Sequence, residues 1–148
     1  ELVRVPLLVY VPGLPARRQP TPRGAIDLAP TMLDLLGVEP PAPNSEDFLS
    51  GVSLVPDLLL NDGEPAKPRP VLIDMQPGPY NSERQAYIED GLKLVTSNSR
   101  PMGLYNLKED PGEKNNLVSD TELVQEQLDK FKEFRSGLKR IYVKPKPR

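Results

Sequence analysis

The sequence predicts an α+β fold, in which a four-stranded antiparallel sheet packs against a C-terminal helix and is preceded by an isolated strand and helix of the α/β type. Four short apolar segments separated by modest loops between residues 70 and 107 predict the sheet. A helical apolar stripe follows them, and an apolar run near the N-terminus precedes an amphipathic helix. A chain of 148 residues is long enough to form a core.

Residues 5–11 are predicted to form the first strand. The run from Val5 to Val11 is almost continuously apolar, which is typical of a strand covered on both faces. Pro6 cannot donate a ladder hydrogen bond, so the pairing should begin after it.

Residues 27–36 are predicted to form a helix. The apolar residues Leu28, Met32, Leu35 and Leu36 have the spacing of one helical face. Asp27 is the predicted N-cap, and Gly37 is predicted to end the helix.

The proline-rich segment 38–69 is predicted to connect two modules and to contain one short helix near 53–60. We therefore divide the chain into a remnant of a large α/β domain, this connecting loop, a C-terminal subdomain and a tail. Their predicted ranges are 1–37, 38–69, 70–143 and 144–148.

The C-terminal subdomain is predicted to begin with four strands, near 71–75, 84–88, 92–96 and 103–107. The pair Asp90-Gly91 is a good signal for a two-residue hairpin turn. The closing helix, near 120–138, is predicted to begin at a capping box in which Ser119 is the N-cap and Glu122 its partner. Its predicted apolar side consists of Val124, Leu128, Phe131, Phe134 and Leu138.

Composition excludes several classes of function. The net charge of −2 is spread along the chain, which indicates no nucleic-acid partner, and no apolar run is long enough to predict a membrane span. The chain has no cysteine and no histidine. Disulfides, thiolate nucleophiles and histidine-based catalysis or metal binding by this chain are therefore excluded. The compartment stays open among periplasmic, secreted and cytoplasmic.

One acidic cluster admits two interpretations. Carboxylate and amide oxygens from a single loop can bind a hard cation such as Ca²⁺. The Pro111-Gly112 pair instead favours a turn whose side chains bond to backbone N–H groups, and we prefer the turn. The residues concerned are Glu109, Asp110, Glu113, Asn115 and Asn116.

Two further sets of charged residues have a structural and a functional interpretation. Asp27 and Asp34 lie seven residues apart on one helix, as paired acid/base carboxylates would, but capping and local hydrogen bonding are favoured. Arg17, Arg18 and Arg23 suit an oxyanion, although an exposed loop is favoured.

The loop before the second sheet strand, which runs from Tyr80 to Arg84, is the predicted rim of a substrate site, because binding residues concentrate on loops. Tyr80, Asn81 and Arg84 are the candidate substrate-binding residues. We predict no catalytic residue and no metal ligand in this chain.

Three motifs together resemble the sulfatase family of the alkaline-phosphatase-like superfamily. They are Arg4-Val5-Pro6-Leu7, the helix segment Asp27-Leu28-Ala29-Pro30-Thr31-Met32-Leu33-Asp34, and the stretch from Leu104 to Leu117 with its Asp110-Pro111 turn. The resemblance implies a large α/β domain followed by a small subdomain of four antiparallel strands and a C-terminal helix.

The resemblance also implies a mechanism whose parts cannot be mapped here. Family members use a formylglycine, made from a Cys/Ser-x-Pro-x-Arg motif, and a divalent cation, here expected to be Ca²⁺ or Mg²⁺. Because the chain opens on Glu1 and lacks those motifs, we interpret it as the C-terminal fragment of a bacterial-type sulfatase. We expect the fragment to be inactive alone, with the upstream catalytic domain as its partner and a small sulfate ester as the substrate of the parent.

Two alternatives stay open. The parent can be a related phosphate or phosphonate ester hydrolase, or a phosphoglycerol or phosphoethanolamine transferase, because the tail motifs do not report on the nucleophile. The chain can also be a non-catalytic interaction module that dimerises through the strand 5–11, since an unpaired apolar strand tends to recruit another chain.

Overall fold

The computed structural model describes residues 5–42, 49–61 and 64–138, and the predicted tail 144–148 lies outside them. The chain divides into two compact units, Glu1–Ile73 and Asp74–Arg148, which are described separately. The four-part division proposed above stays a prediction. None of the helices in the described ranges is long and apolar enough to cross a membrane.

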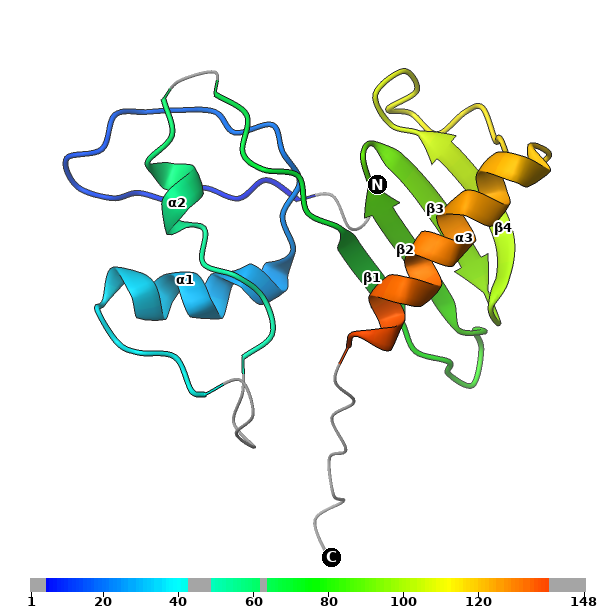
Figure 1. The fold of residues 1–148 in the computed structure, drawn as a ribbon, viewed down its shortest axis with the longest axis horizontal. Coiled ribbons are helices and arrows are strands. Elements are labelled where there is room, and N and C mark those ends of the chain that lie inside the picture. The colour runs from blue at the N-terminus through cyan, green and yellow to red at the C-terminus, as the bar shows by residue number, and fades with distance from the viewer. Residues whose placement is uncertain (1–4, 43–48, 62–63, 139–148) are drawn as a thin grey trace, which may run out of the picture. The chain divides into compact units, whose positions relative to one another are not determined.

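The first unit is built from helices and irregular segments (Figure 1). It contains the 3₁₀ turn Ala25–Asp27, α1 (Leu28–Leu35) and α2 (Val55–Leu58). These elements lie where the sequence places the helix 27–36 and the short helix near 53–60.

No strand forms at Val5 to Val11, so the predicted strand is wrong for this structure. A β-strand exists only where a neighbouring strand completes its backbone hydrogen bonds. Every strand in the described residues belongs to a four-stranded sheet formed by residues 71–106, and residues 5–11 are not part of it. The segment is therefore extended chain, with Leu8 93% and Tyr10 88% exposed.

The helix α1 buries polar residues and exposes apolar ones. Asp27 and Thr31 are buried, at 6% and 4% exposure. The Thr31 hydroxyl donates to the Asp27 carbonyl oxygen and accepts from the backbone N–H of Leu54 at 2.8 Å. The residues of the predicted apolar stripe are exposed, namely Leu28, Met32, Leu35 and Leu36.

The described strands form an antiparallel sheet in the order β1-β2-β3-β4, of which β1 begins in the last residues of the first unit and the rest lies in the second unit (Figure 1). The strands are β1 (Val71–Met75), β2 (Arg84–Glu89), β3 (Leu92–Ser97) and β4 (Arg100–Asn106). The sheet and its order confirm the predicted fold class.

Two tight turns set the register of the sheet. Asp90 and Gly91 have φ of 52° and 86°, as the predicted hairpin turn requires. Asn98 and Ser99 also have positive φ, 47° and 62°, and they form a second two-residue turn. This turn starts β4 at Arg100, three residues before the predicted start, and the edge position of β4 tolerates the proline at 101.

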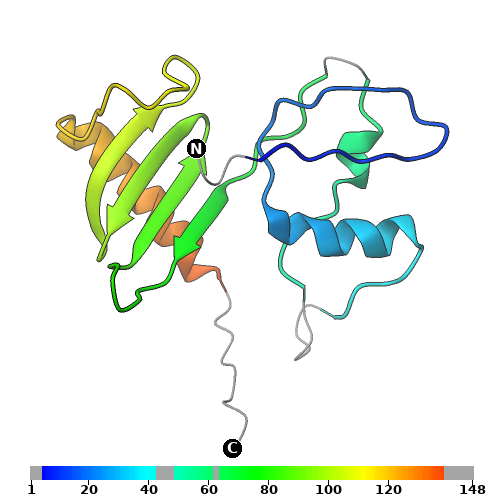
Figure 2. The same ribbon diagram turned by 180° about the vertical axis from the view of Figure 1, so that it is seen from behind.

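The helix α3 (Thr121–Ser136) covers one face of the sheet, as Figures 1 and 2 show from opposite sides. The Tyr87 ring lies 5.4 Å from the Phe131 ring and 5.5 Å from the Phe134 ring, between centroids. The buried apolar residues of this unit are Ala86, Tyr87, Leu94, Leu104, Val124 and Phe131.

Three details of α3 differ from the prediction. The N-cap is Asp120, whose carboxylate accepts from the Leu123 N–H at 3.1 Å, so the assignment of Ser119 is wrong. Gln127 is buried, at 2% exposure. The prediction missed it because a search for apolar periodicity passes over a polar side chain. Leu138 lies beyond the last helical turn and is 45% exposed.

Candidate functional site

The acidic cluster after β4 forms a turn. The Asp110 carboxylate accepts from the Asn115 N–H at 2.7 Å, and Glu113 is paired with Lys93 at 2.8 Å. In the described ranges no group of three or more Asp, Glu, His or Cys side chains is placed to hold a metal ion. The contacts therefore favour the turn over the cation site.

Asn116 covers part of the outer edge of β4. Its side-chain oxygen accepts from the Leu104 N–H, and its amide nitrogen donates to the Met102 carbonyl. The Leu117 N–H also donates to the Leu104 carbonyl, at 2.8 Å. These bonds satisfy backbone groups that an edge strand otherwise leaves open.

Asp27 and Asp34 bind different partners. The buried Asp27 carboxylate accepts from the Val52 N–H at 2.8 Å and lies 3.3 Å from an Arg69 guanidinium nitrogen. Asp27 stands at the N-cap position of α1, as predicted, but its side chain makes no capping bond and anchors the loop. Asp34 accepts from the Ser53 hydroxyl. Both carboxylates have structural partners, which favours the structural interpretation.

The arginines of the proline-rich loop are mostly engaged within the first unit. Arg23 pairs with Asp57 at 2.6 Å and donates to the Lys67 carbonyl at 3.1 Å. Arg17 donates to the Leu58 carbonyl at 3.3 Å. Arg18 is exposed and has no such partner within the described part of the chain. The loop is thus tied to α2, which favours a scaffold over an oxyanion site.

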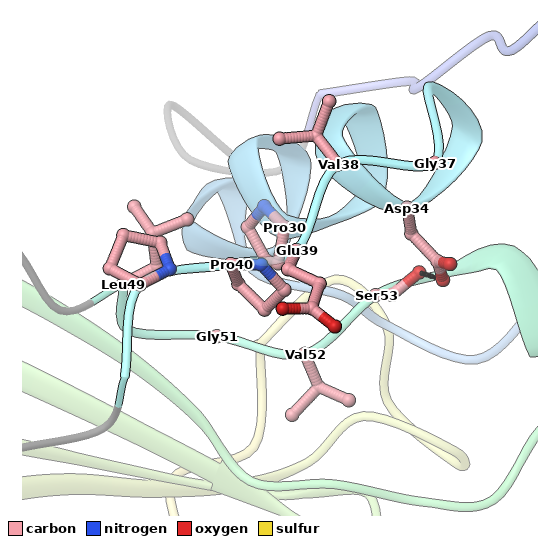
Figure 3. Close-up of a pocket in the computed structure, with 11 residues that line it drawn as sticks. Pro30, Asp34, Gly37, Val38, Glu39, Pro40, Leu49, Gly51, Val52 and Ser53 are labelled. Atoms are coloured by element: carbon pink, nitrogen blue, oxygen red, sulfur yellow. Dashed lines mark hydrogen bonds between the residues drawn. The ribbon is translucent and has the colours of Figure 1, made fainter.

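A hollow of about 590 Å³ lies beside α1 (Figure 3). Its polar side chains include Asp34, which is bonded to Ser53, and Glu39. The rest of the lining is mainly proline, glycine and aliphatic. Of the two carboxylates in this lining, Asp34 is already bonded to Ser53, which favours a structural role for that group.

The predicted rim residues lie in and beside a tight turn that precedes β2. The backbone N–H of Gly78 donates to the Asn81 carbonyl at 3.0 Å, and the Asn81 side chain donates to the Gln76 carbonyl at 3.0 Å. Asn81 is therefore a positioning residue, which holds the turn. Tyr80 is 100% exposed, and Arg84, at the start of β2, is also exposed.

Arg100 is a second exposed arginine near this rim, and the sequence reasoning missed it. Arg84 pairs with Ser97 in the sheet, and Ser97 pairs with Arg100. The signal that would have found it is the Asn98-Ser99 turn, which brings Ser97 and Arg100 opposite each other. The prediction began the fourth strand at 103, so Arg100 was left outside the sheet.

Tyr87 has the most strongly shifted pKa among the described residues. Burial raises the pKa of its phenol well above the ordinary value of 10, and the hydrogen bond with Glu89 adds to the shift. A phenol that keeps its proton so firmly is unsuited to proton transfer near neutral pH. Its role is to pack against α3.

No family model matches this chain, but several curated proteins are similar to it in sequence. It is 30% identical over 136 residues to the choline-sulfatase of Rhizobium meliloti, covering 90% of this chain and 25% of that protein. It is 27% identical to the uncharacterized sulfatase YidJ of Escherichia coli, over 81% of this chain and 23% of the relative. A Delta 4,5-hexuronate-2-O-sulfatase of Bacteroides thetaiotaomicron is also 27% identical, over 81% of this chain and 25% of that protein.

Solved structures resemble the fold. The structure of BT4656 in complex with its substrate D-glucosamine-2-N,6-O-disulfate matches with a TM-score of 0.56 and 27% identity, over 74% of this chain and 22% of that one. The structure of Ps i-CgsB in complex with k-i-k-neocarrahexaose matches in fold with a TM-score of 0.59 and 24% identity, over 77% and 24%.

The chain spans about a quarter of the length of the curated relatives that it matches. The order of its sheet and the helix across one face are those of sulfatase C-terminal domains. Sequence similarity and fold together identify the chain as the C-terminal part of a sulfatase.

Proposed function

We propose that the protein to which this chain belongs hydrolyses sulfate esters, and that this chain supplies a scaffold and part of the rim of the substrate site. The observation that supports the proposal is the similarity to a choline-sulfatase over 90% of the chain. The formylglycine and the divalent cation, Ca²⁺ or Mg²⁺, would belong to the catalytic domain of the longer protein, which is the proposed partner of this chain. There they would supply the nucleophile and the stabilisation of the developing charge.

The chain alone is proposed to be inactive. It contains no cysteine and no histidine, and the carboxylates of Asp110, Asp27 and Glu113 are engaged in a turn, a loop anchor and an ion pair, respectively. Hydrolysis of a sulfate ester requires a nucleophile and groups that stabilise negative charge in the transition state. The residues of this chain can orient a substrate without reacting with it.

The proposed rim consists of Tyr80 and Arg84, with Asn81 holding the turn. The relatives act on chemically different esters, since one is a choline-sulfatase and another a hexuronate sulfatase. An exposed aromatic ring such as that of Tyr80 can contact a quaternary ammonium group or the apolar face of a sugar. Arg84 instead favours an anionic substrate.

The test compares the longer protein with this chain on p-nitrophenyl sulfate and p-nitrophenyl phosphate. We expect the longer protein to cleave the sulfate faster than the phosphate, and the chain alone to cleave neither. A Cys/Ser-x-Pro-x-Arg motif in the longer sequence would agree with this result. Faster cleavage of the phosphate, together with a threonine as the nucleophile, would favour the phosphate or phosphonate esterases and the transferases instead.

A second candidate function, that of an interaction module, is favoured by the apolar surface of the first unit. Leu8 is 93% exposed, and Leu36, at the end of the α1 stripe, is 70% exposed. Exposed apolar surface of this kind promotes association. We propose that the isolated chain dimerises through residues 5–11, and light scattering of the wild type and of Leu8→Lys tests this. A monodisperse wild-type monomer would refute it.

A further inference from the structure

One face of the sheet in the second unit is turned away from α3. The residues of β2 that contact α3 are Tyr87, which packs on Phe131, and Gln85, which accepts from the Arg135 guanidinium at 3.1 Å. Since side chains alternate between the faces of a strand, Arg84 lies on the opposite face. Figure 2 shows that face in front, with α3 behind the sheet.

The register of the sheet places two arginines in one row on this face. Arg84 pairs with Ser97, and Ser97 pairs with Arg100. Directly opposed residues share a face, so all three side chains lie on the side away from α3. With neighbouring strands about 4.8 Å apart, the backbones of the two arginines are about 10 Å apart, which two long guanidinium side chains can bridge.

The charge of this row is not neutralised. Arg84 and Arg100 are exposed, and neither has an ion pair or a side-chain hydrogen bond to any other described residue. By contrast, Lys93, farther along the same face, is paired with Glu113 at 2.8 Å. Glu83 directly precedes Arg84, just outside β2, and forms no ion pair with it in the described part of the chain.

The ring of Tyr105 lies on the same face of the sheet, beside the row formed by Arg84, Ser97 and Arg100. Gly103 pairs with Val95 and lies about 7 Å from the arginine row, two residues along β3. The Tyr105 ring lies over Gly103, since a Cβ added there would be 2.7 Å from Tyr105 Cε2. A group larger than a bare anion can therefore rest on this face with its acidic end at the arginines.

We infer that Arg84, Ser97 and Arg100 bind a second oxyanion of the substrate, so that the substrate is a sulfate ester that carries a further sulfate or carboxylate group. This inference rests on the proposed function. Guanidinium groups match the paired oxygens of such anions, and the Ser97 hydroxyl between them can donate a third hydrogen bond. The same two positive charges disfavour a cationic substrate such as a choline ester.

The experiment titrates the ¹⁵N-labelled 148-residue chain at constant ionic strength with a disaccharide carrying two sulfates, with sodium sulfate and with choline sulfate. We expect the disaccharide to shift the amide signals of Arg84, Ser97 and Arg100 saturably. Arg84→Ala and Arg100→Ala should each weaken binding about threefold or more, and the double variant about tenfold or more. Arg18→Ala removes an exposed arginine of the first unit and should leave binding unchanged.

Three outcomes would overturn the inference. An equal loss in Arg18→Ala would mean that the ligand responds only to net charge. Equal affinities for sodium sulfate and the disaccharide would mean that the row binds free anions and not a substrate. Full binding by the double variant would show that the arginine row is not the binding site, provided that unchanged Leu94 and Leu104 amide signals show the variant to be folded. The titration measures binding and requires no turnover. A longer protein without sulfatase activity would therefore refute the proposed function, but it would not determine whether the arginine row binds the disaccharide.

Discussion

Thr31 and Leu54 are joined by a hydrogen bond of 2.8 Å, in which the threonine hydroxyl accepts from the leucine N–H across 23 residues of sequence. Both residues are buried, at 4% and 5% exposure. Because the same hydroxyl donates to the Asp27 carbonyl, α1 is attached to the loop before α2 through a polar contact. The first unit is therefore organised by hydrogen bonds where an apolar core would be expected.

Replacing Thr31 by valine keeps the shape of the side chain and removes this acceptor. The Leu54 N–H would be left buried without a partner, which costs about 1–3 kcal/mol. We expect faster hydrogen exchange at the Leu54 amide and a lower urea midpoint for the first unit. Thr31→Ser retains the hydroxyl and should lie close to the wild type, and equal exchange rates in the two variants would contradict this account.

Gly51 lies where a side chain has no room. A Cβ at this position would collide with the Ile26 carbonyl oxygen, and the φ of +98° already disfavours any L side chain. Gly51→Ala should therefore destabilise the first unit by clearly more than the roughly 1–2 kcal/mol of left-handed strain alone.

Gly13 is the matched control for this substitution. Its φ is +86°, and a Cβ would meet nothing within 4 Å. Gly13→Ala should show the strain without the collision, as measured by urea unfolding followed by circular dichroism. Equal losses of stability in the two variants would show that the contact with Ile26 adds nothing.

Gln127 offers an opportunity to stabilise the second unit. It is 2% exposed, and its side-chain oxygen has no hydrogen-bond partner among the described residues. An unpaired buried polar atom costs about 1–3 kcal/mol, so Gln127→Leu or Gln127→Met should raise the unfolding temperature of this unit. Gln125→Leu changes an exposed position of the same helix and should have little effect. A lower unfolding temperature in both Gln127 variants would mean that the amide has a partner after all.

The second unit was the more predictable from sequence, because its signals are local. The segment 71–75 coincides with β1, and the Asp90-Gly91 turn fixes the hairpin of β2 and β3. A two-residue turn needs only its own φ angles. The same rule, applied to Asn98-Ser99, would have extended β4 to Arg100 and completed the arginine row.

The first unit was less predictable, because its outcome depends on neighbours. The run from Val5 to Val11 has the composition of a buried strand, but it pairs with no strand among the described residues. The spacing of apolar residues located α1 correctly and did not reveal that its polar side is the buried one. Only the partners of Asp27 and Thr31, in loops far along the sequence, decide that orientation.

Tyr87 should make the second unit sensitive to alkali. Its pKa is raised in the fold, mainly by burial, so the folded state holds the phenolic proton more tightly than the unfolded chain does. The contribution to stability is complete below the ordinary pKa of 10 and is lost as the pH rises above it. Absorbance at 295 nm should show Tyr87 ionising last of the five tyrosines, together with unfolding of the unit.

Tyr87→Phe is the matched variant for this prediction, because it keeps the ring between Phe131 and Phe134 and removes the ionisable group. Its stability, measured by urea unfolding, should fall less steeply than that of the wild type between about pH 9.5 and 11.5. This range begins just below the ordinary tyrosine pKa of about 10 and extends above it. Tyr10→Phe alters an exposed tyrosine outside this unit and should retain the wild-type slope. A Tyr87→Phe variant with the same alkaline slope as the wild type would show that other groups cause the loss of stability.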